Sequence, residues 1–142
     1  MKELEIRGSN LLFLITYKLI PMRNAIHNNQ ILKIDIEPNS GNMYGRKNGK
    51  NIFILEFFKF TDRMKLTNLK VFQENKGFGS FALKEFEKWV KELNFSEIYG
   101  ELVEGTDCDN PDKLKYFYSK NGYTIINNTR TNGSYAEISK KI

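Results

Sequence analysis

The sequence predicts an α+β fold in which helices flank a mixed, mostly antiparallel central sheet. Three observations support this class. Segments rich in β-forming residues fill the first half of the chain, an amphipathic helix pattern follows the glycines Gly77 and Gly79, and strand and helix patterns then alternate. A strand, a helix and a second strand in succession predict a parallel pair with the helix packed over it. That pair would be residues 66–72 and 97–103.

Four strands are predicted in the first half of the chain, because apolar, β-branched and aromatic residues run together or alternate there. These strands are residues 11–20, 31–36, 52–60 and 66–72. Pro21 ends the first of them. Turn-forming residues cluster at 38–42 and 46–51. The best candidate for a helix before Gly77 is the short, polar segment 23–30.

The clearest helix follows the glycine turn. Its apolar residues recur at helical spacing and form one stripe, with charged residues opposite. The stripe consists of Ala82, Phe86, Trp89, Val90 and Leu93. Asn94 suits a left-handed residue that stops the helix, since asparagine tolerates positive φ.

Strand and helix patterns continue after residue 96. Residues 97–103 predict a strand, and Asn110 and Pro111 predict the N-cap and first residue of a short helix that ends near Gly122. Two further strands are predicted, at residues 123–126 and 134–139. The Asn132-Gly133 pair suggests a tight turn before the last strand.

The 142 residues suit one domain, residues 1–142. The net charge of +5 favours anionic ligands, but its lysines are dispersed and do not form a nucleic-acid patch. Cys108 is the only cysteine, which excludes an internal disulfide and a cysteine zinc site and favours a reducing cytoplasm. The apolar run 11–20 is too short to span a bilayer. We therefore predict no metal and no membrane partner.

The segment 66–83 carries the most chemical information. It predicts a strand, a glycine turn and the start of a helix, and such a turn presents unpaired backbone N–H groups at the positive end of the helix. Phosphate oxygens bind well to such a site, so the segment favours an enzyme that holds a nucleotide-bearing cofactor.

Two spaced motifs resemble those of the GNAT superfamily of N-acetyltransferases. In that family the motif Arg/Gln-x-x-Gly-x-Gly/Ala precedes and begins the central helix. The matching residues here, 74–79, read Glu-Asn-Lys-Gly-Phe-Gly. Both glycines are present, and Glu74 stands where the family has arginine or glutamine. The family also ends its next helix with a pattern like Leu-Tyr-x-x-x-Gly-Phe, and residues 117–123 read Phe-Tyr-Ser-Lys-Asn-Gly-Tyr. The resemblance covers roughly residues 66–126. It implies a three-layer fold whose parallel strands splay apart to hold coenzyme A.

The resemblance implies acetyl-CoA as the co-substrate. Backbone amides of the glycine turn would hold its diphosphate, and main-chain groups of residues 69–72 would pair with its pantetheine arm. Asn110, at the start of the later helix, is a further candidate contact. The predicted cofactor-binding residues are Leu69, Val71, Phe72, Lys76, Gly77, Phe78, Gly79, Ser80 and Asn110.

The resemblance also implies direct attack of an amine on the thioester, with coenzyme A leaving as a thiol. Tyr118 matches the family's tyrosine and is the predicted proton donor to the sulfur. The attacking amine needs a base, and four carboxylates are candidates: Glu56, Asp62, Glu101 and Glu104. Glu101 ranks first because it lies on the strand beside the cofactor. The lone His27 is predicted to be solvated in a polar loop.

The sequence does not decide between two classes of acceptor. The absence of a strong amphipathic helix before Gly77 predicts an open acceptor groove, which suits a protein lysine or N-terminus. The acidic residues Glu101, Glu104, Asp107 and Asp109 could instead attract a small polycation. The alternative function is a non-catalytic GNAT-like domain or a basic module that binds a protein or nucleic acid, although no recognition motif for nucleic acid is present. The sequence does not decide whether the chain forms a homodimer.

Overall fold

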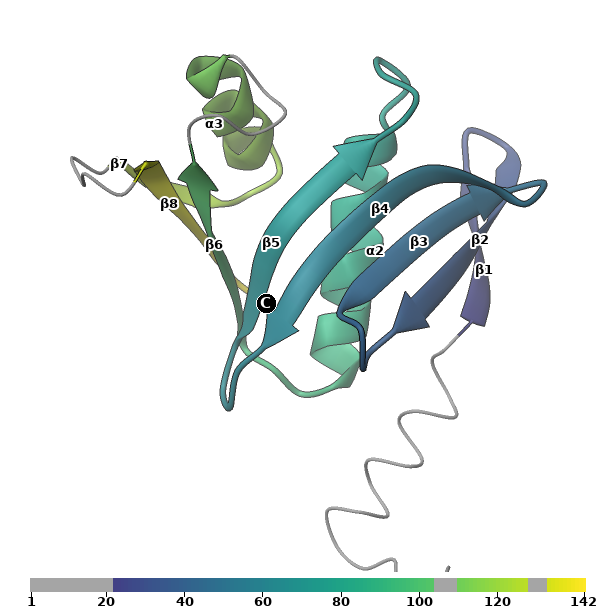
Figure 1. Cartoon of the computed structure of the whole chain (residues 1–142), viewed down its shortest axis with the longest axis horizontal. Helices are drawn as coiled ribbons and strands as arrows, with labels where there is room; N and C mark the ends of the chain where they lie inside the picture. Colours follow the sequence, from purple (N-terminus) through teal and green to yellow (C-terminus); the bar gives the residue numbers. More distant parts are fainter. Residues whose placement is uncertain (1–21, 104–109, 128–132) are drawn as a thin grey trace, which may run out of the picture.

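The computed structural model describes residues 22–103, 110–127 and 133–142 (Figure 1). These residues form an 8-stranded sheet in the order β1-β2-β3-β4-β5-β6-β8-β7. Every neighbouring pair is antiparallel except β5 and β6, which are parallel. The sheet confirms the predicted mixed, mostly antiparallel architecture with one parallel pair. The strand predicted at residues 11–20 and the residues Glu104, Asp107, Cys108, Asp109 and Asn132 lie outside the described part of the chain.

The first four strands form a meander of antiparallel hairpins. They are β1 (Met22–His27), β2 (Gln30–Glu37), β3 (Asn42–Lys47) and β4 (Lys50–Lys59). Two of the connections are two-residue turns in which both residues have positive φ: Asn28 and Asn29 at 49° and 62°, and Asn48 and Gly49 at 53° and 79°. Two consecutive positive φ values define the type I′ turn, whose twist matches that of the flanking strands.

The best helix candidate before Gly77, residues 23–30, is not a helix, because this segment is β1, a turn and the start of β2. Exposure alternates along β1, with Met22, Asn24 and Ile26 exposed. The polar Asn28-Asn29 pair is a hairpin turn, a role that asparagine fills because it tolerates positive φ. The sequence analysis also missed β3, which is short and polar and depends on pairing with β2 and β4 on its two sides.

The second half follows the predicted order of strands and helices. It contains β5 (Met64–Val71), α2 (Phe78–Glu92), β6 (Glu97–Val103), α3 (Pro111–Lys120), β7 (Thr124–Asn127) and β8 (Ser134–Lys141). Asn94 has φ of 66° just after α2, as predicted. Asn110 caps α3, since its side chain accepts a hydrogen bond from the Lys113 N–H at 3.2 Å. No helix in the described residues is long and apolar enough to cross a membrane.

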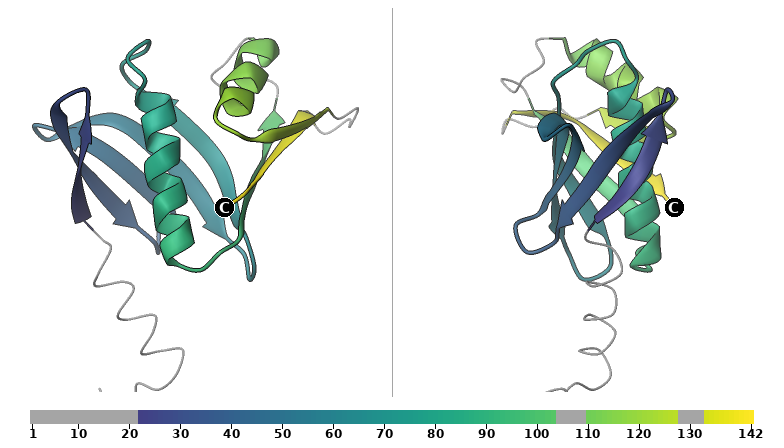
Figure 2. Two further views of the ribbon diagram at one scale, coloured as in Figure 1. Left: turned by 180° about the vertical axis from the view of Figure 1, so that it is seen from behind. Right: turned by 90° about the vertical axis from the view of Figure 1, so that its right-hand side faces the viewer.

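The core lies between α2 and one face of the sheet (Figure 2). The Phe57 ring packs on Trp89 and Phe86, with centroid distances of 4.9 and 5.5 Å. Each such buried ring contributes about 2 kcal/mol of hydrophobic stabilisation. The predicted stripe is buried, with Leu93 partly so. Glu85, predicted on the polar face, is buried as well and pairs with the Lys88 ammonium at 2.8 Å.

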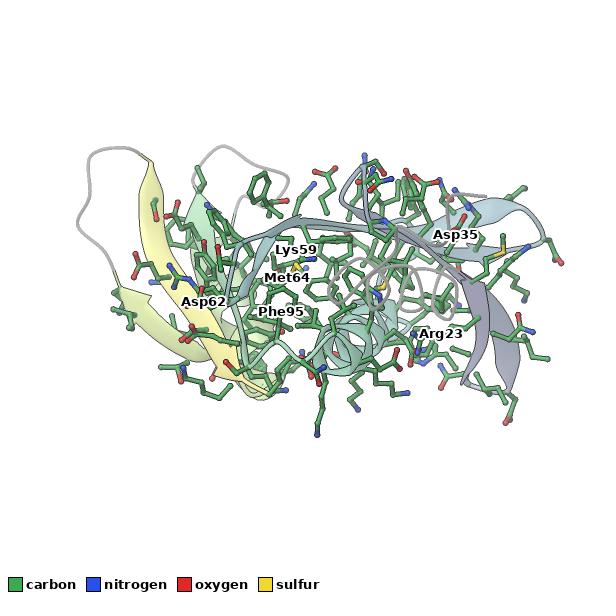
Figure 3. All side chains as sticks on the ribbon, turned by 90° about the horizontal axis from the view of Figure 1, so that it is seen from below. Arg23, Asp35, Lys59, Asp62, Met64 and Phe95 are labelled. Atoms are coloured by element: carbon green, nitrogen blue, oxygen red, sulfur yellow. The ribbon has the colours of Figure 1, made fainter. Side chains whose placement is uncertain are left out.

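Side chains on the two faces of the sheet have different environments. Figure 3 shows that Arg23 points to the side of α2, whereas Asp35 points to the opposite side. The Arg23 guanidinium donates to both carboxylate oxygens of Glu92 at 3.0 and 2.8 Å, which joins β1 to the C-terminal end of α2. Asp35 pairs with Arg46 at 2.8 Å on the face that α2 does not cover. The α2 face of the sheet forms the core.

Candidate functional site

The glycine turn between β5 and α2 leaves a helix start without a side-chain cap. Gly77 is the N-cap of α2 with φ of 76°, a conformation that glycine adopts without steric cost. The helical ladder begins where the Phe81 N–H donates to the Gly77 carbonyl at 3.0 Å, so the first-turn N–H groups precede it. No described side chain caps α2 and no acidic residue lies in its first turn, whereas Asn110 caps α3. The start of α2 is therefore suited to an anion.

The end of α3 fixes the start of α2. The Phe117 ring lies against Gly79, where an added Cβ would come within 3.0 Å of it. Asn121 Nδ2 donates to Ser80 Oγ at 3.1 Å. Lys140 of β8 donates to the Asn121 carbonyl at 2.9 Å and to Glu87 of α2 at 2.9 Å. The two sequence motifs, separate along the chain, therefore meet at the first turn of α2.

A polar hollow of about 310 Å³ lies beside the glycine turn. It is lined by two lysines, four amide side chains and one aromatic residue, namely Lys47, Lys76, Asn28, Gln30, Gln73, Asn75 and Phe78. None of these residues comes from β6 or α3, whereas Lys76 and Phe78 are among the predicted cofactor-binding residues. The hollow therefore adjoins the predicted diphosphate site and does not extend into the region between β5 and β6.

The parallel strands β5 and β6 separate near their midpoints. They pair only at Met64, Lys65 and Leu66, opposite Ile98, Tyr99 and Gly100. Thr67 is an extra residue in the ladder to β4, which is a β-bulge at the point of separation. At Gly100 an added Cβ would lie 2.7 Å from the Leu66 carbonyl oxygen, so only glycine permits the last close pair. Beyond it the strands diverge toward the glycine turn (Figure 1).

The main chain of β5 turns alternate peptide groups toward this gap. The Phe72 N–H donates to the Ile52 carbonyl of β4 at 2.9 Å. In an antiparallel ladder hydrogen-bonded residues alternate, so Lys70 also bonds to β4, and the N–H and C=O groups of Leu69 and Val71 face β6. Leu69 and Val71 therefore turn main-chain groups toward the gap, and their binding to a cofactor stays a prediction. The Phe72 N–H is not directed into the gap, because β4 already accepts it.

Tyr118 is a buried residue of α3. Its ring makes edge contacts with Phe117 and Tyr123 at centroid distances of 5.1 and 5.6 Å. Burial, with a smaller contribution from Tyr135, raises the pKa of Tyr118 well above 10.0. The phenol is therefore protonated at neutral pH, which is the form that a proton donor requires.

Glu101 is half-buried on β6, one residue beyond the last pair with β5. Ile98 and Leu102 of the same strand point into the core, so by alternation the Glu101 side chain lies on the face away from α2. Glu137 of β8 lies directly opposite Glu101 in the ladder, a second carboxylate that the sequence analysis missed. The only sequence feature that could have indicated Glu137 is the alternation of polar and apolar residues in the strand predicted at 134–139.

The other candidate bases are placed differently. Glu56 is exposed on β4, opposite Asn68 and beside the bulge of β5. Asp62 lies in the β4–β5 turn, which precedes β5 and is at the opposite end of this strand from the glycine turn (Figure 1), and this position removes Asp62 as a base for the site. Glu104 lies outside the described residues. No group of three or more His, Cys, Asp or Glu side chains within the described ranges could hold a metal ion.

His27 contradicts the prediction of a solvated loop residue. It is the last residue of β1, and its Nε2 lies 2.7 Å from the Lys76 carbonyl oxygen of the glycine turn. Its ring packs on Phe78 and Phe81 of α2, with both centroid distances 4.9 Å. No local pattern predicts this contact, because 49 residues separate the two partners along the chain.

Comparison with solved structures identifies the fold. An acetyltransferase of the GNAT family from Listeria monocytogenes 4b F2365 superposes with a TM-score of 0.64 and 9% identity, over 84% of this chain and 100% of that chain. The PaiA N-acetyltransferase from Thermoplasma acidophilum, in complex with coenzyme A, superposes with a TM-score of 0.58 and 18% identity, over 71% of this chain and 60% of that chain. A GNAT family acetyltransferase from Elizabethkingia anophelis with acetyl-CoA bound has a TM-score of 0.59 and 16% identity, over 73% of this chain and 78% of that chain.

Sequence comparison adds no closer relationship. No model of a protein family matches this sequence, and no curated protein matches it at a significant level. Identities below 20% establish the fold and not the substrate. The chain therefore has the fold of the GNAT acetyltransferases.

Proposed function

We propose that this protein is an acetyl-CoA-dependent N-acetyltransferase that moves an acetyl group to a primary amine. One observation carries the proposal: the uncapped start of α2 and the gap between β5 and β6 lie at the same end of the sheet. An elongated anionic thioester fits this combination, with its diphosphate at the helix end and its arm along the strand. Structural neighbours that contain coenzyme A or acetyl-CoA support the choice of donor.

The chain offers main-chain contacts along this path. The diphosphate would bind backbone N–H groups of residues 76–80, where Gly77 and Gly79 allow close approach. Leu69 and Val71 would pair with the amides of the pantetheine arm. Asn110 is a weaker candidate, because its side-chain oxygen already caps α3.

Acetyl-CoA supplies the activated acyl group, and two side chains would manage the protons. Tyr118, held neutral by burial, would donate its phenolic proton to the departing sulfur. Glu101, on the face away from α2, would accept a proton from the amine, directly or through water. The acceptor would then approach from the face of the sheet that α2 does not cover.

A protein lysine or N-terminus is our preferred acceptor. Residues 22–77 contain strands and turns and no helix, so no helical wall from this stretch encloses the acceptor side. An open surface favours an extended or macromolecular amine over a small metabolite enclosed in a pocket. We further propose a cytoplasmic enzyme, because acetyl-CoA is an intracellular donor and the lone Cys108 excludes an internal disulfide.

The test is release of free coenzyme A from acetyl-CoA by the purified full chain. Peptides with a free N-terminus or an internal lysine should stimulate release more than spermidine or an aminoglycoside. N-terminally acetylated peptides without lysine are the control. Stimulation by the small amines alone would overturn the choice of acceptor. Binding of acetyl-CoA without release in any mixture would favour the non-catalytic alternative.

A further inference from the structure

The β1–β2 hairpin contacts the glycine turn through His27. Nε2 of this histidine lies 2.7 Å from the Lys76 carbonyl oxygen. A carbonyl oxygen can only accept a hydrogen bond, so the contact requires a proton on Nε2. Asn28 Nδ2 lies 3.2 Å from His27 Nε2 and 3.5 Å from the same oxygen. A protonated Nε2 cannot accept from Asn28, so Asn28 is a second, weaker donor to the Lys76 oxygen. The carbonyl is therefore held toward β1.

The direction of this carbonyl fixes the direction of the next N–H. The peptide between Lys76 and Gly77 is planar and, like every described peptide bond, not cis. In a trans peptide the C=O and the N–H point in opposite directions. Holding the Lys76 oxygen toward β1 therefore turns the Gly77 N–H away from β1.

This orientation matters because one peptide can present either sign of its dipole. With the N–H outward it attracts a phosphate, whereas with the carbonyl outward it repels one. Glycine at position 77 gives no Cβ barrier to the flipped arrangement, since glycine populates both signs of φ readily. A contact from outside the turn is needed to select one orientation.

The hairpin is built to supply that contact. The type I′ turn at Asn28 and Asn29 places His27 at the tip of β1, and the two donations from Arg23 to Glu92 fix the start of β1 on the other end of α2. The ring of His27 also packs on Phe78 and Phe81. Its imidazole is thus held by strand, turn and helix.

We infer that His27 is a positioning residue for the cofactor: its Nε2–H holds the Lys76–Gly77 peptide so that the Gly77 N–H faces the diphosphate. The inference rests on the proposed function. It assigns to the hairpin a role at a site from which it is distant in sequence, and it requires no contact between His27 and the cofactor.

Two substitutions separate hydrogen bonding from packing. His27→Phe keeps an aromatic ring against α2 and removes the donor, whereas His27→Gln keeps an N–H donor and removes the ring. We expect the Kd for coenzyme A, measured by calorimetry, to rise about fivefold in His27→Phe, the effect of one lost hydrogen bond. His27→Gln should restore most of the affinity. The reverse order would overturn the inference, because it would assign the effect to packing.

Controls separate failure of the inference from failure of the proposed function. Ile26→Ala, on the exposed side of the same strand, should bind like the wild type, and unfolding temperatures without ligand show whether each variant is folded. NMR of the ligand-free protein should show a slowly exchanging Nε2 proton on His27. If the wild type binds coenzyme A and His27→Phe binds equally, only the inference fails. If the wild type does not bind it, both fail.

Discussion

The environment of Tyr118 determines what this residue can do. Burial raises the pKa of its phenol above 10.0, so the proton stays on the oxygen over the pH range in which the enzyme would work. A buried neutral phenol can donate a proton to a sulfur leaving group and cannot act as a base. In the proposed mechanism Tyr118 would therefore be the acid, and the base would be a different group, a carboxylate.

Replacing Tyr118 with phenylalanine should lower kcat about 100-fold, the size typical of a lost general acid. The ring contacts with Phe117 and Tyr123 remain, so the Kd for acetyl-CoA should change little. Steady-state kinetics and calorimetry measure the two quantities separately. Tyr116→Phe, an exposed ring on the same helix, is the matched control. Unchanged turnover in Tyr118→Phe would remove the residue from the acid role.

The same burial predicts a loss of stability at alkaline pH. In the unfolded chain the Tyr118 phenol ionises near its ordinary pKa of 10.0, whereas the folded protein keeps the proton. Above about pH 10 the unfolded state binds fewer protons than the folded state, so the free energy of unfolding falls as pH rises. Urea unfolding at pH 9 and pH 11 should show this fall, and it should be smaller in Tyr118→Phe. An equal fall in both proteins would show that Tyr118 is not the cause.

At the scale of elements, the site depends on where one helix begins and where one pair of strands separates. The bulge at Thr67 and the close contact at Gly100 end the β5–β6 ladder after three pairs. The Gly77 turn then starts α2 at the open end of that gap. Neither element alone would hold an elongated thioester, because one supplies only an anion site and the other only a strand edge.

Two glycines with the same backbone conformation separate strain from function. Gly77 and Gly49 have φ of 76° and 79°. An added Cβ at Gly49 meets nothing within 4 Å, whereas one at Gly77 would lie 3.3 Å from the His27 ring, so Gly77→Ala also tests the contact with His27. Gly77→Ala and Gly49→Ala should each lower the free energy of unfolding by about 1 kcal/mol, the cost of a left-handed alanine. Only Gly77→Ala should also weaken coenzyme A binding, as calorimetry would measure. Equal binding by both variants would exclude the turn as the diphosphate site.

Amide hydrogen exchange tests the gap along β5. The N–H groups of Leu69 and Val71 face β6 beyond the point of separation, whereas those of Lys70 and Phe72 bond to β4. In the ligand-free protein, Leu69 and Val71 should exchange faster than their neighbours. Saturating coenzyme A should slow exchange at Leu69 and Val71 and leave the neighbours little changed. Uniform protection before ligand addition would show that no open edge exists.

On the scale of the whole molecule, the cofactor would bridge two parts of the sheet. Strands β1 to β5 pack on α2, while β6, β8 and β7 form the second part, and beyond residue 66 the two parts are no longer paired with each other. Contacts between α3 and α2, such as Asn121 to Ser80, join them on the helix side. A ligand along the gap would add a further connection.

Acetyl-CoA should therefore stabilise the whole fold in one step. At a free concentration of 100 times Kd, linkage gives about 2.7 kcal/mol, which for a chain of 142 residues raises Tm by about 8 °C. Thermal unfolding with and without ligand measures the shift. Adenosine 3′,5′-bisphosphate, which lacks the pantetheine arm, is the control and should give a smaller shift at the same concentration. No shift with acetyl-CoA would overturn the proposed function.

Some features of the site could be predicted because they depend on neighbours in sequence. The Gly77–Gly79 turn, the stripe of α2 and the Asn110 cap each follow from the local preferences of a few consecutive residues. β1 and β3 could not be predicted in this way. Their residues are polar or weakly patterned, and they are strands because neighbouring strands satisfy their backbone hydrogen bonds.

The sequence by itself determined the order of strands and helices in the second half, the parallel pair and the glycine turn. Only the tertiary structure decided that β5 and β6 separate after Gly100, that the Phe72 amide is occupied by β4, and that His27 lies against the Lys76 carbonyl. The physical reason is the separation along the chain of the residues that interact. Turns and helix starts are set by the φ preferences of the residues that form them. These three features instead join segments that come together only when the strands pair and the sheet packs on α2.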